Sequence, residues 1–65
     1  MFIEVHGYKT GNVIYINADK ITSLEPYKKG GATVIFGDTA TFTQENHHEI
    51  MYRIEEAKKY ANITL

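Results

Sequence analysis

The adjacent histidines His47 and His48 are the residues best suited to metal chemistry in this chain, because imidazole is a common metal ligand. Neighbouring residues of an α-helix point about 100° apart, so the two rings cannot hold one ion from a regular helix. No Asp, Glu or His lies four residues after either histidine to serve as a partner. We therefore predict that His47 is partly buried, that His48 faces solvent, and that the protein holds no metal or other cofactor.

Nucleophiles and carboxylates also lack the surroundings that catalysis requires. A hydrolase needs a nucleophile, a base and a group that orients the base, but Ser23, the only serine, has no Gly-x-Ser-x-Gly context. Glu55 and Glu56 are typical of a solvated helix face, and Asp19 and Asp38 are typical of turns. The glycines match no phosphate-binding pattern that leads into a helix. The sequence therefore predicts a protein that is not an enzyme.

The composition bounds the class of protein. The 65 residues include seven basic and eight acidic side chains, 43% hydrophobic residues and no cysteine. A chain of this size forms a single small domain, here residues 1–65, and its composition argues against disorder. Without cysteine it forms neither disulfides nor thiolate metal sites. Residues 1–4 are too short and too acidic for a signal peptide, and no apolar run approaches the ~20 residues that span a bilayer. We expect a cytoplasmic protein that does not enter membranes.

Alternation of apolar and polar residues with period two dominates the first two thirds of the chain and predicts β-strands. Strands are expected at about residues 2–6, 13–17, 21–26, 32–36 and 39–43. Gly37-Asp38, between the last two, is the strongest hairpin signal, because a two-residue loop requires positive φ. Pro26 has no amide proton, so we expect it at an edge or at the end of its strand.

A helical period replaces this alternation after Gln44 and predicts a helix over about residues 46–60. The apolar stripe consists of Ile50, Ile54, Ala57 and Ala61. Asn46 followed by Glu49 resembles a capping box, and Thr43 is the competing cap. The pairs expected at the favourable i,i+4 spacing are Glu49–Arg53 and Glu55–Lys59.

Short connections between the strands favour antiparallel neighbours. The predicted fold is α+β, an antiparallel four- or five-stranded β-meander followed by one carboxyl-terminal α-helix packed on one sheet face. One helix covers only one face of such a sheet. A domain of about 60 residues buries only about 60% of the surface of its unfolded chain, so the uncovered apolar face is expected to be covered by association.

The predicted function is therefore a small non-enzymatic protein-interaction module that self-associates, in a biological process that the sequence does not identify. A homodimer is favoured, because most oligomers of one chain are twofold dimers. An unidentified partner protein is the other occupant considered for this face. The candidate contact residues are Phe2, Val13, Tyr15 and Tyr27.

Nucleic-acid binding is the alternative function. Five tyrosines and lysine-bearing loops could form a sheet that stacks on bases and has basic edges. The contacts would then be Lys9, Lys28, Lys29 and Tyr8. The formal net charge of −1 supplies no bulk attraction for phosphates, and the chain lacks the aromatic strand motif common in RNA-recognition domains. Self-association is therefore the favoured prediction.

Several short apolar segments occur in a characteristic order. They are Met1-Phe2-Ile3, Ile14-Tyr15-Ile16-Asn17 followed by Ile21, then Ser23-Leu24-Glu25, Gly37, and Glu45 with Glu49-Ile50. This order, which extends over nearly the whole chain, resembles the FlbD-like (SwrD-type) flagellar-operon proteins, a group of very short bacterial and phage-borne proteins. The resemblance implies an amino-terminal strand, a hairpin with a central glycine and a short carboxyl-terminal helix, and it supplies no catalytic residues. Residues 7–11 and 44–48 depart from the pattern of that group.

Overall fold

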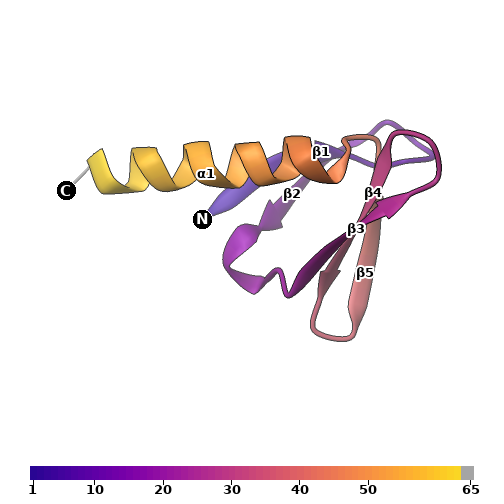
Figure 1. Ribbon diagram of the computed structural model, residues 1–65, viewed down its shortest axis with the longest axis horizontal. Coiled ribbons are helices and arrows are strands. Elements are labelled where there is room, and N and C mark those ends of the chain that lie inside the picture. Colours follow the sequence, from indigo (N-terminus) through magenta and orange to yellow (C-terminus); the bar gives the residue numbers. More distant parts are fainter. Residues whose placement is uncertain (64–65) are drawn as a thin grey trace.

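The computed structural model describes residues 1–63 as antiparallel strands followed by one long helix (Figure 1). In chain order the elements are β1 (Phe2–His6), β2 (Val13–Asn17), the 3₁₀ turn η1 (Ala18–Lys20), β3 (Ser23–Tyr27), β4 (Gly31–Phe36), β5 (Thr39–Thr43) and α1 (His47–Ile63). The predicted α+β class, with antiparallel strands and a carboxyl-terminal helix, is confirmed. Within residues 1–63, no helix is both long and apolar enough to cross a bilayer.

The strands divide between two sheets, whereas the sequence suggested one meander. β1 and β2 form a two-stranded sheet, and β3, β4 and β5 form a three-stranded sheet in that order. The reason lies at η1, where the Asn17 side chain accepts a hydrogen bond from the Asp19 backbone N–H at 3.1 Å and caps the turn. This turn separates β2 from β3 in space, so the two strands do not pair (Figure 1).

The end of β1 connects the two sheets instead. Gly7 forms an isolated antiparallel bridge with Thr43. On either side of this bridge, the Tyr8 N–H donates to the Phe42 carbonyl and the Gln44 N–H donates to the His6 carbonyl, both at 2.9 Å. The hairpin of β1 and β2 is therefore joined to β5 through backbone hydrogen bonds, although most of its length diverges from the larger sheet.

Two local predictions for the larger sheet are confirmed. Gly37 lies in the turn between β4 and β5 with φ 67°, a left-handed conformation that glycine adopts without steric cost. Pro26 lies on β3, an edge strand, where its missing N–H removes no central hydrogen bond.

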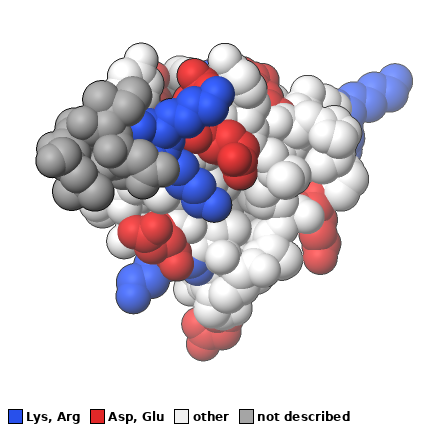
Figure 2. Space-filling model, turned by 60° about the vertical axis from the view of Figure 1, so that its left-hand side comes forward, with Lys and Arg blue, Asp and Glu red and all other residues white. Residues whose placement is uncertain are grey.

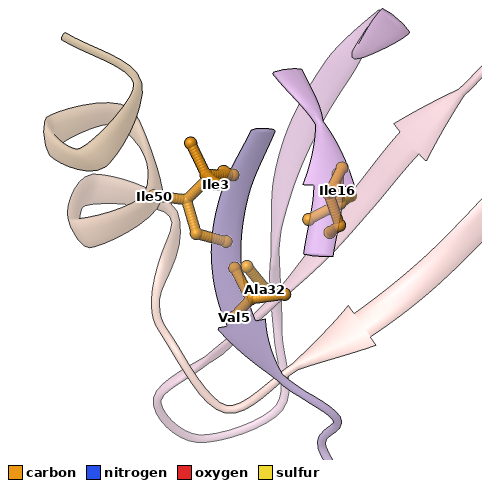
Figure 3. Packing of buried hydrophobic residues seen from close by; sticks show 6 residues of the cluster. Ile3, Val5, Ile16, Ala32 and Ile50 are labelled. Atoms are coloured by element: carbon orange, nitrogen blue, oxygen red, sulfur yellow. The ribbon is translucent and has the colours of Figure 1, made fainter. Parts of the chain in front are cut away.

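The core lies between the two sheets and under the first turns of α1. Its buried members are Ile3, Val5, Ile16, Ala32, Val34 and Ile50. Figure 3 shows Ile50 of α1 pointing toward Ile3 of β1, which brings the helix onto the hairpin. The far end of α1 extends past the strands (Figure 1), so the helix covers only part of the sheet surface.

Asn46 caps α1, as its side-chain oxygen accepts a hydrogen bond from the Glu49 N–H at 2.8 Å. The competing cap, Thr43, is buried, and its hydroxyl donates to the Glu45 carbonyl at 2.9 Å. Helix α1 therefore begins at His47, directly after the Asn46 cap.

Of the two ion pairs expected on α1, one forms and one does not. Arg53 and Glu49 approach to 3.0 Å at the predicted i,i+4 spacing. The predicted Glu55–Lys59 pair is wrong, because Lys59 lies 2.9 Å from Glu56 at i,i+3 spacing. Both spacings place side chains on the same face of a helix, and periodicity does not choose between them.

Replacing Ile50 tests whether this residue holds α1 on the sheets. Ile50→Ala should lower the free energy of unfolding by about 2–5 kcal/mol, because it leaves a cavity in a fully buried position. The milder Ile50→Val should cost about 1 kcal/mol. Urea unfolding followed by circular dichroism measures both losses. Met51→Ala, one residue later and 52% exposed, is the control and should change stability by less than about 0.5 kcal/mol. Equal losses at both positions would contradict this packing.

Candidate functional site

The outer side of the β1–β2 hairpin exposes three apolar side chains that the sequence singled out. Phe2, Val13 and Tyr15 are 66%, 50% and 67% exposed. Successive side chains of a strand point to opposite faces, and the intervening Ile3 and Ile16 are buried in the core. We call Phe2, Val13 and Tyr15 the hairpin face. It is the uncovered apolar surface that the sequence predicted.

Polar residues surround the hairpin face. The strand register pairs Phe2 with Asn17, Tyr15 with Glu4, and Val13 with His6. Each apolar side chain therefore has a polar neighbour on the facing strand. An apolar centre with a polar rim is typical of protein–protein interfaces.

Tyr27, the fourth predicted contact, lies on the other sheet. Its ring meets Tyr8 edge-on, with centroids 5.0 Å apart and an interplanar angle of 86°. The Tyr27 ring also contacts the Phe42 ring, with centroids 4.3 Å apart. These separations are typical of favourable aromatic pairs. We call Tyr8, Tyr27 and Phe42 the aromatic cluster, which is separate from the hairpin face in the sheet arrangement.

A glycine explains why the aromatic cluster forms. Gly31 lies opposite Tyr27 in the register of β3 and β4 and is buried. A Cβ atom at Gly31 would lie 2.9 Å from the Tyr8 ring and 2.6 Å from the Thr43 carbonyl oxygen. The Tyr8 ring therefore lies directly on bare backbone, an arrangement by which aromatic residues stabilise a glycine within a sheet. The cluster thus has a structural role of its own.

Lysines lie beside the aromatic cluster. The Lys28 Nζ is 5.4 Å from the Tyr27 ring centroid, within the range of a cation–π interaction. Lys9 borders an open, mainly apolar hollow of about 290 Å³ whose lining includes all three aromatic residues. Lys29 follows Lys28 in the turn before β4 and is exposed. On the face seen in Figure 2, blue basic and red acidic side chains are interspersed.

A buried carboxylate occupies the outer edge of β1. Glu45 is only 7% exposed, and its carboxylate accepts a hydrogen bond from the His6 backbone N–H at 2.9 Å. The other carboxylate oxygen lies 2.6 Å from His6 Nδ1 and 3.9 Å from the Arg53 guanidinium. Arg53 also donates to the Glu4 carbonyl. Side chains therefore occupy backbone groups that a further strand would need for pairing with β1.

The environment of Glu45 determines its ionisation. Burial by itself raises the pKa of the Glu45 carboxyl, because it disfavours the charged form. The hydrogen bonds from the side chain and backbone of His6 oppose that effect and hold the pKa below its ordinary value. The carboxylate is therefore ionised where it binds the end of β1.

The two adjacent histidines stack on each other, with ring centroids 4.1 Å apart. His47 is half-buried and His48 is exposed, as predicted. Among residues 1–63, no three His, Asp or Glu side chains lie close enough to hold a metal ion. The histidine pair therefore has no third His, Asp or Glu ligand nearby among these residues.

Sequence reasoning missed the pairing of His6 with Glu45 and the place of Phe42 in the aromatic cluster. His6 and Glu45 are 39 positions apart. In the sequence, His6 is accounted for as the end of a strand and Glu45 as an acidic residue before a helix. Phe42 alternates like any other strand residue. No pattern in the sequence places the first strand beside the start of the helix, so neither contact had a signal.

No protein-family model, curated protein or solved structure matches this chain. The resemblance to the FlbD-like flagellar-operon proteins therefore stays a prediction based on short segments. Any function has to be inferred from the two surfaces described above and from their chemistry.

The pH dependence of stability tests the role of Glu45. Because its pKa in the folded protein lies below the ordinary 4.5, the ionised carboxylate stabilises the fold above that pH. This contribution is lost as the pH falls through the folded pKa. Urea unfolding between about pH 5.5 and pH 2.5 should therefore show a smaller loss of stability in Glu45→Gln than in the wild type. The control is Glu25→Gln, an exposed carboxylate on β3 outside this group of contacts, which should follow the wild type. An equally steep loss in Glu45→Gln would contradict this role.

Proposed function

We propose that this protein is a small non-enzymatic cytoplasmic module that self-associates through the hairpin face. The supporting observation is that Phe2, Val13 and Tyr15 stay at least half exposed while the other side of the same two strands forms the core. Apolar side chains that gather on one face, rather than lying scattered, mark surfaces that associate.

The small core supports the same proposal. Among residues 1–60, whose burial the structure describes, six apolar residues are fully or nearly buried, and the chain has no cysteine to add a disulfide. Small domains commonly gain stability through oligomerisation. A twofold dimer would cover the hairpin face of each copy with the same face of the other.

An estimate of the energies shows what the dimer requires. Burying one large apolar side chain contributes roughly 1.5–3 kcal/mol, and association costs about 4–15 kcal/mol in lost freedom and ordering. The six side chains of a dimer, each already partly buried in the monomer, give a gain of the same order as this cost, so further interactions between the copies decide how stable the dimer is. Backbone hydrogen bonds between the copies would supply such interactions.

Sedimentation velocity tests self-association directly. The wild type should sediment as a dimer at tens of micromolar and shift toward the monomer on dilution. Tyr15→Lys should weaken the dimer at least about tenfold, because it places a charge at the centre of the hairpin face. Met51→Lys is the matched control, since Met51 is an exposed apolar residue of α1 outside this face. A wild type that sediments only as a 7.4 kDa monomer would contradict the proposal.

A second candidate function, nucleic-acid binding, is favoured by one observation. The fold brings Tyr8 and Tyr27 together with Lys28 at one end of the larger sheet, and Lys9 borders the adjoining hollow. Aromatic rings beside basic side chains are a common surface for single-stranded nucleic acids. The contact between Tyr8 and Gly31 explains the same rings structurally, so this function ranks second.

Fluorescence anisotropy of a labelled single-stranded RNA tests this second candidate at low salt. Binding through the aromatic cluster should be abolished by the double variant Lys28→Glu/Lys29→Glu, because phosphate contacts supply most of the affinity. Lys58→Glu/Lys59→Glu makes the same change of charge on α1 and should leave binding nearly unchanged. No binding by the wild type at low salt, or an equal loss in both double variants, would exclude this site.

A further inference from the structure

The outer edge of β2 has backbone groups available for pairing. The Gly7 N–H donates to the Asn12 carbonyl at 2.9 Å, which sets the hydrogen-bond pattern of the hairpin. Alternate residues of an antiparallel strand bond to the same partner. Ile14 therefore directs its N–H and C=O toward β1, while Val13 and Tyr15 direct theirs away. Within residues 1–63, no other element forms a backbone hydrogen bond with Val13 or Tyr15.

The outer edges of β1 and β3 carry features that discourage pairing. The outer edge of β1 is occupied by Glu45 and Arg53, as described above. The outer edge of β3 carries Pro26 and the charged Glu25. Proline and charge are typical protections of an edge strand. β2, with the sequence Val-Ile-Tyr-Ile-Asn, has neither proline nor a charged residue.

An apolar hollow lies beside the same strand. Its volume is about 200 Å³, and its lining residues are Ile14, Tyr15, Ile16, Asn17, Lys20, Phe36 and Thr41. Ile14 and Phe36 pack against the core but stay partly exposed. A strand laid along β2 would extend the layer of inward side chains over this hollow. One strand paired with β2 would therefore both satisfy the open backbone groups and cover the exposed part of the core.

We infer that this partner is the β2 strand of a second copy, paired antiparallel across a twofold axis at Tyr15. The inference rests on the proposed function and specifies how the copies meet. The five residues of β2 overlap fully only when Tyr15 faces Tyr15 of the second copy and Val13 faces Asn17. The two hairpins then form one four-stranded sheet in the order β1-β2-β2-β1.

The sequence of β2 favours a second copy over an unrelated strand. Ile14 and Ile16 flank Tyr15 symmetrically, so a twofold axis at Tyr15 places Ile14 opposite Ile16 on the core side. The two Tyr15 rings become neighbours on the outer side, within one continuous hairpin face. No charged residue of one β2 opposes another. Such an interface is self-complementary and closes at two copies.

Crosslinking through introduced cysteines tests the register, since the chain has no cysteine of its own. Directly paired, hydrogen-bonded residues of antiparallel strands have Cα atoms about 5.5 Å apart, within the range that a disulfide spans. Tyr15→Cys should therefore form a linked dimer rapidly when the protein is treated with diamide. Val13→Cys is the matched control on the same strand, because four residue steps, about 13 Å, would separate its two copies. It should crosslink at least about tenfold more slowly.

Replacing Tyr15 with proline or with threonine tests whether the backbone N–H of residue 15 takes part in the dimer. Both remove the tyrosine ring, but only proline removes the outward N–H, and neither loses a hydrogen bond within the monomer. Tyr15→Pro should therefore dimerise at least about tenfold more weakly than Tyr15→Thr in sedimentation velocity, with folding checked by circular dichroism. If Tyr15→Pro does not fold, the crosslinking rates of Tyr15→Cys and Val13→Cys test the strand pairing instead.

The outcomes separate this inference from the function on which it rests. A wild-type dimer with rapid crosslinking only in Tyr15→Cys supports edge pairing. A wild-type dimer in which Val13→Cys crosslinks as fast as Tyr15→Cys, or neither crosslinks, overturns edge pairing and leaves self-association standing. Equal dimerisation of folded Tyr15→Pro and Tyr15→Thr also overturns it. A wild type that is monomeric at tens of micromolar overturns both.

Discussion

The attachment of the end of β1 to the segment before α1 is the constraint on which the rest of the structure depends. His6 accepts a backbone hydrogen bond from Gln44, and its own N–H and ring contact the buried Glu45 carboxylate. These contacts join the hairpin to the three-stranded sheet and set where α1 begins. Ile50 can then reach the core between the sheets. A buried carboxylate is favourable here because hydrogen bonds compensate for its lost hydration.

The same attachment determines where the exposed apolar surfaces lie. It uses the outer edge of β1, so pairing by the hairpin has to take place at β2, next to the hairpin face. It also brings Tyr8 alongside Phe42, which completes the aromatic cluster over Gly31. The two surfaces considered for function are therefore consequences of one set of contacts between distant parts of the chain. The hairpin face has no such internal explanation, and this difference favours association over nucleic-acid binding.

The size of the chain explains why so much apolar surface remains exposed. One helix, with its far end beyond the strands, covers only the side where Ile50 packs (Figure 1). Phe2 and Tyr15 alternate with the buried Ile3 and Ile16 and stay about two-thirds exposed, so no further element among residues 1–63 buries them. In a larger domain a second layer would bury such residues. Here a second copy of the chain could supply that layer through strand pairing.

The sequence by itself determined the local elements and the alternation of faces. The approximate strand ranges, the Gly37 turn, the Asn46 cap and the exposure of Phe2 and Tyr15 follow from residues close in sequence, because periodicity and turn chemistry are local. The third strand, expected from residue 21, begins at Ser23 because Ile21 ends the 3₁₀ turn. Only the tertiary structure decided that β1 joins β5 instead of β2 joining β3, that Glu45 binds His6, and that Tyr27 belongs to a different surface from Tyr15. Those outcomes depend on contacts between segments far apart in the chain, and no local pattern specifies which distant strand edge or side chain will be met.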